Sequence, residues 1–206
     1  MKHQLTLAAA LVFVLSACTG PSTPTTVVTP PGTPVPATSE VALSPSPGDA
    51  TATPSRQEQL EPGASTCVAG TRYNVNRAGN YRLSGPCEVV AIGADRADVD
   101  ITGAVGSLTV NGQRNEVDAG DIAEITISGD DNDVEARKVT GVQVQGQRNA
   151  VDAFSIETVT VVGDRNELDG GARIGVVTVN GNSNEFEARE IGTRNDTGSR
   201  NRFETR

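Results

Sequence analysis

The chain repeats one short motif every 17 or 18 residues, and this period restricts the possible folds more than any other feature. Each copy has a glycine, two variable residues, an asparagine and then an alternation of apolar and acidic residues. The end copies are degenerate. The seven copies are ADRADVDI at 94–101, GQRNEVDA at 112–119, GDDNDVEA at 129–136, GQRNAVDA at 146–153, GDRNELDG at 163–170, GNSNEFEA at 181–188 and GSRNRFET at 198–205.

A short stretch of alternating apolar and polar residues precedes most copies, as in VTV at 159–161. The period is too short for helical repeats, which need about 30 residues or more. Alternation places the apolar side chains on one face of a strand, and only stacked copies can enclose that face. We therefore predict an all-β fold, a parallel β-solenoid (β-helix) of about seven coils of 17–18 residues over residues 89–206.

The asparagine of each copy has the same parity as the apolar residue two positions later, so we expect its side chain to point inward. A buried amide without partners costs about 1–3 kcal/mol, but stacked amides can hydrogen-bond from coil to coil. The first glycine of each copy is expected at a corner that needs positive φ or close stacking. The predicted structural asparagine ladder comprises Asn115, Asn132, Asn149, Asn166, Asn184 and Asn201.

The N-terminus has the pattern of an export signal. Lys2 precedes an apolar run at 5–15, which is shorter than the ~20 residues that span a bilayer. LSAC at 15–18 resembles the lipobox of bacterial lipoproteins, which implies acylation of Cys18 and cleavage before it. We expect a lipoprotein signal peptide at 1–17 and an extracytoplasmic protein held at the bacterial cell or outer membrane by lipid on Cys18. Ordinary secretory cleavage, with Cys18 incidental, is the alternative.

Residues 18–64 carry ten of the eleven prolines and show no strand or helix periodicity, so we predict a disordered linker. Residues 65–88 are predicted to form an N-terminal cap. In an exported protein, the two cysteines of this cap, Cys67 and Cys87, are expected to form a disulfide. A zinc site is disfavoured there because CxxC spacing and histidine ligands are missing.

Composition excludes several function classes. The net charge is −9, from 17 basic and 26 acidic residues, which is unsuited to binding nucleic acid. The single histidine, His3, falls in the predicted signal peptide, and there is no GxSxG motif or phosphate loop. Coils this short leave no room for the long loops that form glycosidase clefts. We expect no enzyme activity, no catalytic residues, no cofactor and no metal site.

Two columns of carboxylates flank the buried apolar column and are predicted to face outward. Stacked like charges repel, so arginines that precede the asparagines are expected to pair with them; Ca²⁺ binding is the alternative. An outward threonine column, broken by Gln143, also fits ice binding, but exposed-strand propensity explains it more simply. The columns are Asp98, Glu116, Asp133, Glu167 and Glu185, and Asp100, Asp118, Glu135, Asp152, Asp169, Glu187 and Glu204; the arginines are Arg96, Arg114, Arg148, Arg165 and Arg200.

Residues 85–205 resemble a bacterial family called domain of unknown function 3060, found in exported and lipid-anchored proteins. The resemblance is carried by SGPC at 84–87 and by turns such as VTVVGDRNEL at 159–168; Ala97 stands where asparagine is expected. It implies a β-solenoid without an assigned activity. We expect a lipid-anchored extracytoplasmic structural or interaction module, monomeric, whose protein or glycan partner is unknown. The alternative is a surface protein that binds cations or glycans through the acidic columns.

Overall fold

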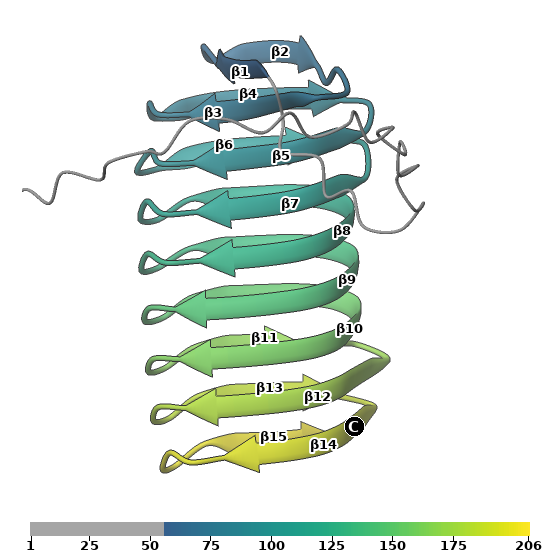
Figure 1. The fold of residues 1–206 in the computed structure, drawn as a ribbon. Helices are drawn as coiled ribbons and strands as arrows, with labels where there is room; N and C mark the ends of the chain where they lie inside the picture. Colours follow the sequence, from purple (N-terminus) through teal and green to yellow (C-terminus); the bar gives the residue numbers. More distant parts are fainter. Residues whose placement is uncertain (1–55) are drawn as a thin grey trace, which may run out of the picture. The chain divides into compact units, whose positions relative to one another are not determined.

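A computed structural model describes residues 56–206, which form a parallel β-solenoid of about nine coils, each of about 17 residues (Figure 1). All pairings between its strands are parallel. The strands are β1 (Arg56–Gln59), β2 (Gly63–Thr66), β3 (Thr71–Val75), β4 (Gly79–Ser84), β5 (Cys87–Ile92), β6 (Ala97–Ile101), β7 (Val105–Val110), β8 (Glu116–Ile127), β9 (Asp133–Gln145), β10 (Ala150–Val162), β11 (Glu167–Asp169), β12 (Arg173–Asn180), β13 (Glu185–Ala188), β14 (Glu190–Asp196) and β15 (Arg202–Thr205).

Each coil has two strand segments, and the chain connects successive segments at two different edges of the solenoid. At the turn edge, a tight turn such as 111–115 joins the segments of one coil; these turns lie at the left of Figure 1. At the bend edge, on the right, the chain passes from one coil to the next. In β8, β9 and β10 the strand continues through this bend, so each of these strands spans two coils. The bend edge comprises the residues that follow the acidic columns, such as 120–121, 137–138 and 154–155.

Aliphatic side chains in register from coil to coil fill the interior. Val142, Val159 and Val177 are aligned and buried, as are Val134, Val151 and Leu168. The alternating pattern of the sequence therefore produces the predicted apolar interior. At about 4.8 Å per coil, nine coils make a stack about 40 Å long.

Glycines at the turn edge allow the turns to stack closely. A Cβ on Gly112, Gly129 or Gly146 would lie 1.7, 1.9 or 2.1 Å from a carbonyl oxygen of the preceding turn. Close stacking, and not positive φ, is therefore what these three positions require. The left-handed conformation falls instead on the residue before the asparagine position, with φ between 55° and 59°; these residues are Arg96, Arg114, Asp131, Arg148, Arg165, Ser183 and Arg200.

The asparagine column lies next to these turns and points inward. Asn149 represents it: its Nδ2 donates to Asn166 Oδ1 (3.1 Å) and to the Gly129 carbonyl (3.0 Å). Its Oδ1 accepts the backbone N–H (3.0 Å) and Nδ2 (3.1 Å) of Asn132. Each amide thus links three successive turns. The amide-to-amide bonds run through Asn115, Asn132, Asn149, Asn166, Asn184 and Asn201, and the first five of these residues are buried.

The described solenoid includes the residues from Arg56 onward, so the predicted boundaries at its N-terminal end were wrong. Residues 65–88, expected as a separate cap, belong to regular coils, in which Tyr73 and Tyr81 occupy interior columns. Residues 56–64, assigned to the linker, contribute β1 and the start of β2. These coils lack the repeated turn motif, which is why seven coils were predicted instead of nine. The predicted signal peptide and linker residues 18–55 lie outside the described residues.

Polar residues cover the interior at both ends of the described stack. In the first coil, Glu58 and Ser65 stand in register with Tyr73 and Leu83. In the last coil, the Arg194 guanidinium lies 5.3 Å from the centre of the Phe203 ring, which stacks on Phe186. Such polar terminal coils protect a solenoid from pairing with other chains.

Asp196 ends the asparagine ladder. Its Oδ1 accepts a hydrogen bond from Asn201 Nδ2 at 2.8 Å, so the last amide has a partner although no further coil follows among the described residues. Within residues 56–206, no helix is long and apolar enough to cross a membrane.

Candidate functional site: the acidic face

The strongest concentration of charge lies on the outer side of β6, β11, β13, β15 and the first segments of β8, β9 and β10. Period-2 alternation turns the residues on either side of each buried apolar residue outward, as Asp133 and Glu135 flank Val134. We call this surface the acidic face. It comprises twelve carboxylates: Asp98, Asp100, Glu116, Asp118, Asp133, Glu135, Asp152, Glu167, Asp169, Glu185, Glu187 and Glu204.

Ion pairs neutralise only the C-terminal end of the acidic face. Arg202 pairs with Glu185 and Glu204, and Arg206 pairs with Asp169 and Glu187. The other eight carboxylates form no ion pair with the described residues; they are Asp98, Asp100, Glu116, Asp118, Asp133, Glu135, Asp152 and Glu167.

The expected arginine network across the acidic face was wrong. The arginines in question occupy the left-handed position of the turns and lie at the turn edge. Arg148 pairs there with Asp131 (Nη2 to Oδ2, 2.8 Å), and Arg165 donates to Gln147 Oε1 at 2.6 Å. The arginines therefore interact along the turns, and the central carboxylates have no cationic neighbour in ion-pair contact among the described residues.

Burial and neighbouring charges raise the pKa of two central carboxylates of the acidic face. Burial raises the pKa of Asp133, and the charges of Asp152 and Asp118 add to this effect. The Asp118 charge raises the pKa of Glu135, with smaller effects from burial and from Asp133. By contrast, a hydrogen bond from Arg148 lowers the pKa of Asp131. The acidic face thus has a repulsion that a bound cation would relieve.

The acidic face offers charge without a metal-binding geometry. Within residues 56–206, no three or more Asp, Glu, His or Cys side chains converge to hold a metal ion. The carboxylates stand in columns along one side of the stack, about 4.8 Å apart from coil to coil. Such an array suits an extended cationic partner better than a single coordinated ion.

The opposite strand segments carry two outward columns without any charge. The predicted threonine column lies here, on β7, β12, β14 and the second segments of β8, β9 and β10. The two columns are Thr109, Thr126, Gln143, Thr160, Thr178 and Asn195, and Asn111, Ser128, Gln145, Val162, Asn180 and Thr197. A cationic partner therefore meets a very different surface on each side of the stack.

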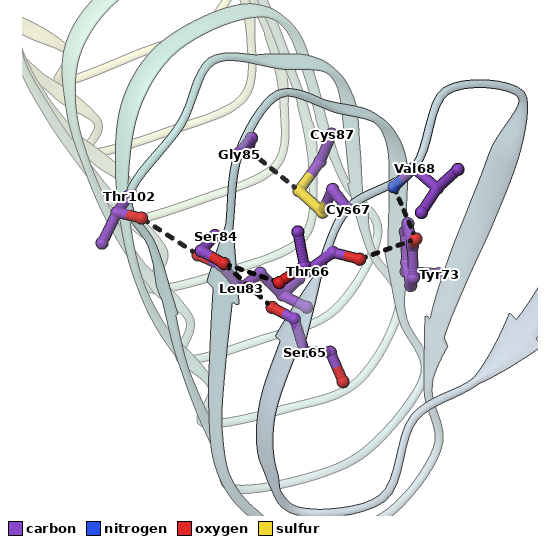
Figure 2. Close-up of a disulfide and its surroundings, with 10 residues drawn as sticks. All are labelled: Ser65, Thr66, Cys67, Val68, Tyr73, Leu83, Ser84, Gly85, Cys87 and Thr102. Carbon is purple, nitrogen blue, oxygen red and sulfur yellow. Dashed lines mark hydrogen bonds between the residues drawn. A yellow bond between two sulfur atoms is a disulfide. The ribbon is translucent and has the colours of Figure 1, made fainter.

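The disulfide joins Cys67 and Cys87, with their Cα atoms 5.1 Å apart (Figure 2). It connects the end of the first coil to the start of β5. Beside it, the Tyr73 hydroxyl accepts the Val68 N–H (2.8 Å) and donates to the Thr66 carbonyl (3.2 Å). Strands β1 and β2 are exposed, so this link and the buried Leu60 are important attachments of the first coil. Cys18 lies outside the described residues.

Sequence reasoning missed the bend edge. Phe154 is 65% exposed there, the largest exposed fraction among the large hydrophobic residues of the described part. The signal for it was available, because Phe154 follows Ala153 directly and so has outward parity.

Residues 92–140 match the model of a family described as protein of unknown function (DUF3060). The matched segment runs from the end of β5 into β9 and so includes the first coils with the regular turn motif. Searches of the curated proteins and of the solved structures found no match for the chain.

Proposed function

We propose that the chain is a lipid-anchored extracytoplasmic module, without catalytic activity, that binds a cationic partner through the acidic face. The observation that carries the proposal is a set of eight carboxylates on one side of the stack that form no ion pair within residues 56–206. Their mutual repulsion is relieved when a cationic surface covers them, which favours binding and speeds association.

The export and anchoring parts of the proposal rest on the sequence. LSAC at 15–18 supplies a thiol at the site where bacterial lipoproteins are acylated, and two or more acyl chains give stable anchoring. Membrane fractionation of cells that express the chain tests this part. We expect the full chain in the membrane fraction and the Cys18→Ala variant outside it; retention of the variant in the membrane would contradict lipid anchoring.

A polylysine peptide is a suitable probe of the acidic face. We compare two triple variants that have the same net charge. Asp118→Asn/Glu135→Gln/Asp152→Asn removes three central carboxylates of the acidic face. Its matched control, Glu58→Gln/Glu124→Gln/Glu157→Gln, removes three carboxylates elsewhere. We expect the first variant to lose at least tenfold more affinity than the control at low salt, where screening is weak. Equal losses would show that only net charge matters and would refute a localised binding face.

Divalent cations are a second candidate, favoured by the raised pKa of Asp133 and Glu135. Because no three ligands converge among the described residues, we expect loose counter-ion binding. Calorimetric titration with Ca²⁺ at constant ionic strength distinguishes loose counter-ion binding from a specific calcium site. A saturable stoichiometric site would favour specific calcium binding over a cationic partner.

A further inference from the structure

The path of the chain at the bend edge changes after β10. The 139–155 coil has 17 residues, and β10 continues through its bend into the next coil. The next coil, 156–173, has one residue more, and the chain leaves the sheet between Asp169, where β11 ends, and Arg173, where β12 begins. Gly171, at φ 38°, forms the projecting turn, and its N–H donates to Asp169 Oδ1 at 2.8 Å. In Figure 1 the bend points outward below β10.

A groove of about 530 Å³ lies on the outer surface beside this turn. Lys138, Ser155 and Arg173 follow one another along one wall, in successive coils. Gly175 and Gly192 line the groove without side chains, and a Cβ there would lie 2.5 or 2.2 Å from a carbonyl oxygen of the preceding coil. Val176, 40% exposed, adds an apolar surface.

Among the residues that line the groove, basic side chains outnumber acidic ones. Lys138 is the one lysine among residues 56–206, and no ion pair with the described residues engages it. Arg173 approaches Glu190 at 3.6 Å, with both side chains largely exposed, a contact that contributes little. Glu157 is the single carboxylate that lines the groove. Two cations against one carboxylate, beside an exposed valine, give a local preference for an anion with an apolar part.

We propose that this groove binds a small organic carboxylate that carries an aromatic or branched aliphatic group. The carboxylate accepts hydrogen bonds from Lys138 and Arg173, which are charge-assisted and therefore the stronger kind. The apolar group covers Val176 and the exposed backbone of Gly175 and Gly192. The volume lies within the range of ligand sites, 300–1,000 Å³. This site is separate from the acidic face, so either proposal stands without the other.

Nuclear magnetic resonance of the ¹⁵N-labelled full chain with Cys18→Ala tests the proposal, with phenylacetate and benzylamine as probes of opposite charge. We expect phenylacetate to shift the amide signals of Ser155, Gly175 and Gly192 saturably, and benzylamine to leave them unchanged. Equal shifts with both probes, or no saturable shift with phenylacetate, would overturn the proposal.

A pair of variants locates the cationic contacts. Lys138→Gln/Arg173→Gln should bind phenylacetate at least tenfold more weakly. Arg137→Gln/Arg189→Gln is the matched control, because it also removes two positive charges; both side chains are exposed, Arg137 pairs with Asp121, and neither residue lines the groove. All these side chains are exposed, so the variants keep the fold, and unchanged spectra elsewhere verify this. Affinity that is equal in both variants would place the binding site elsewhere.

Discussion

The two edges of the solenoid differ in how strictly their residues repeat from coil to coil. At the turn edge, nearly every coil from residue 112 onward has the same glycine, left-handed residue and asparagine. At the bend edge, the corresponding positions hold Gly120, Arg137, Phe154 and Arg189, and the number of residues varies. The turn edge buries amides and stacks backbone at close distance, so each coil must repeat the last. The bend edge keeps its backbone paired by parallel strands and exposes its side chains, which leaves them free to vary. We therefore expect adaptable surface features at the bend edge.

The largest effect should follow from breaking the asparagine ladder. Asn149→Leu leaves the N–H and Nδ2 of Asn132 and the Gly129 carbonyl without their partner. Each unsatisfied buried group costs about 1–3 kcal/mol, so we expect a loss of about 4 kcal/mol. Phe154→Ser at the bend edge should stay within about 0.5 kcal/mol, as surface changes usually do. Urea unfolding measures both, and similar midpoints would refute the distinction between the edges.

A single methyl group tests the close stacking of the turns. In Gly129→Ala the new Cβ would lie 1.9 Å from the Gly112 carbonyl oxygen, which forces the turns apart. In Gly120→Ala, at the bend edge, the closest atom is the Gly103 carbonyl oxygen at 3.0 Å. We expect losses of about 3 kcal/mol and about 1 kcal/mol or less, respectively. Equal melting temperatures for the two variants would show that the turns can separate at no cost.

A stabilising change is expected at the left-handed position of the turn. Arg114 has φ 55°, a conformation that is unfavourable for residues with a Cβ. Arg114→Gly should raise the stability by about 1 kcal/mol. Arg189→Gly, at the bend edge and without positive φ, should lower it by about 0.5–1 kcal/mol through chain entropy. Thermal melts of the two variants should therefore shift in opposite directions.

The same contrast explains what the sequence predicts well. The period, the apolar columns and the inward parity of the asparagines are all repeated, so six or seven copies support each inference. Parity alone places Asn149 inside, and the structure has it buried. The family match over residues 92–140 falls within this regular part.

Features that occur once could not be predicted in this way. The first coil was missed because Glu58 and Ser65 occupy interior columns and interrupt the apolar alternation. The arginines were assigned to the wrong partners because parity says on which side a residue lies, but not that a left-handed turn directs Arg148 toward Asp131. The groove at the bend edge is lined by residues of successive coils, such as Lys138, Arg173 and Gly192, and no repeated pattern in the sequence marks it.

The smallest expected effect concerns the carboxylates that lie between the two edges. Raised pKa values for Asp133 and Glu135 mean that the folded state binds protons more tightly than the unfolded state. Their protonation therefore stabilises the fold, and stability should rise as the pH falls from 7 toward about 4, where carboxyl groups of the unfolded chain titrate. The lowered pKa values of Asp121 and Asp131 act in the opposite sense and reduce stability only at lower pH.

Asp133→Asn/Glu135→Gln isolates this contribution. The double variant should be more stable than the original chain at pH 7, and its melting temperature should change less between pH 7 and about pH 4. Asp121→Asn, at the bend edge, is the control, because it removes a carboxylate paired with Arg137 and should leave the rise intact. High salt should reduce the rise as well, since screening weakens repulsion among exposed charges. If the melting temperature instead falls steadily from pH 7, favourable interactions of ionised carboxylates outweigh their repulsion, and a cationic partner would gain nothing by covering them.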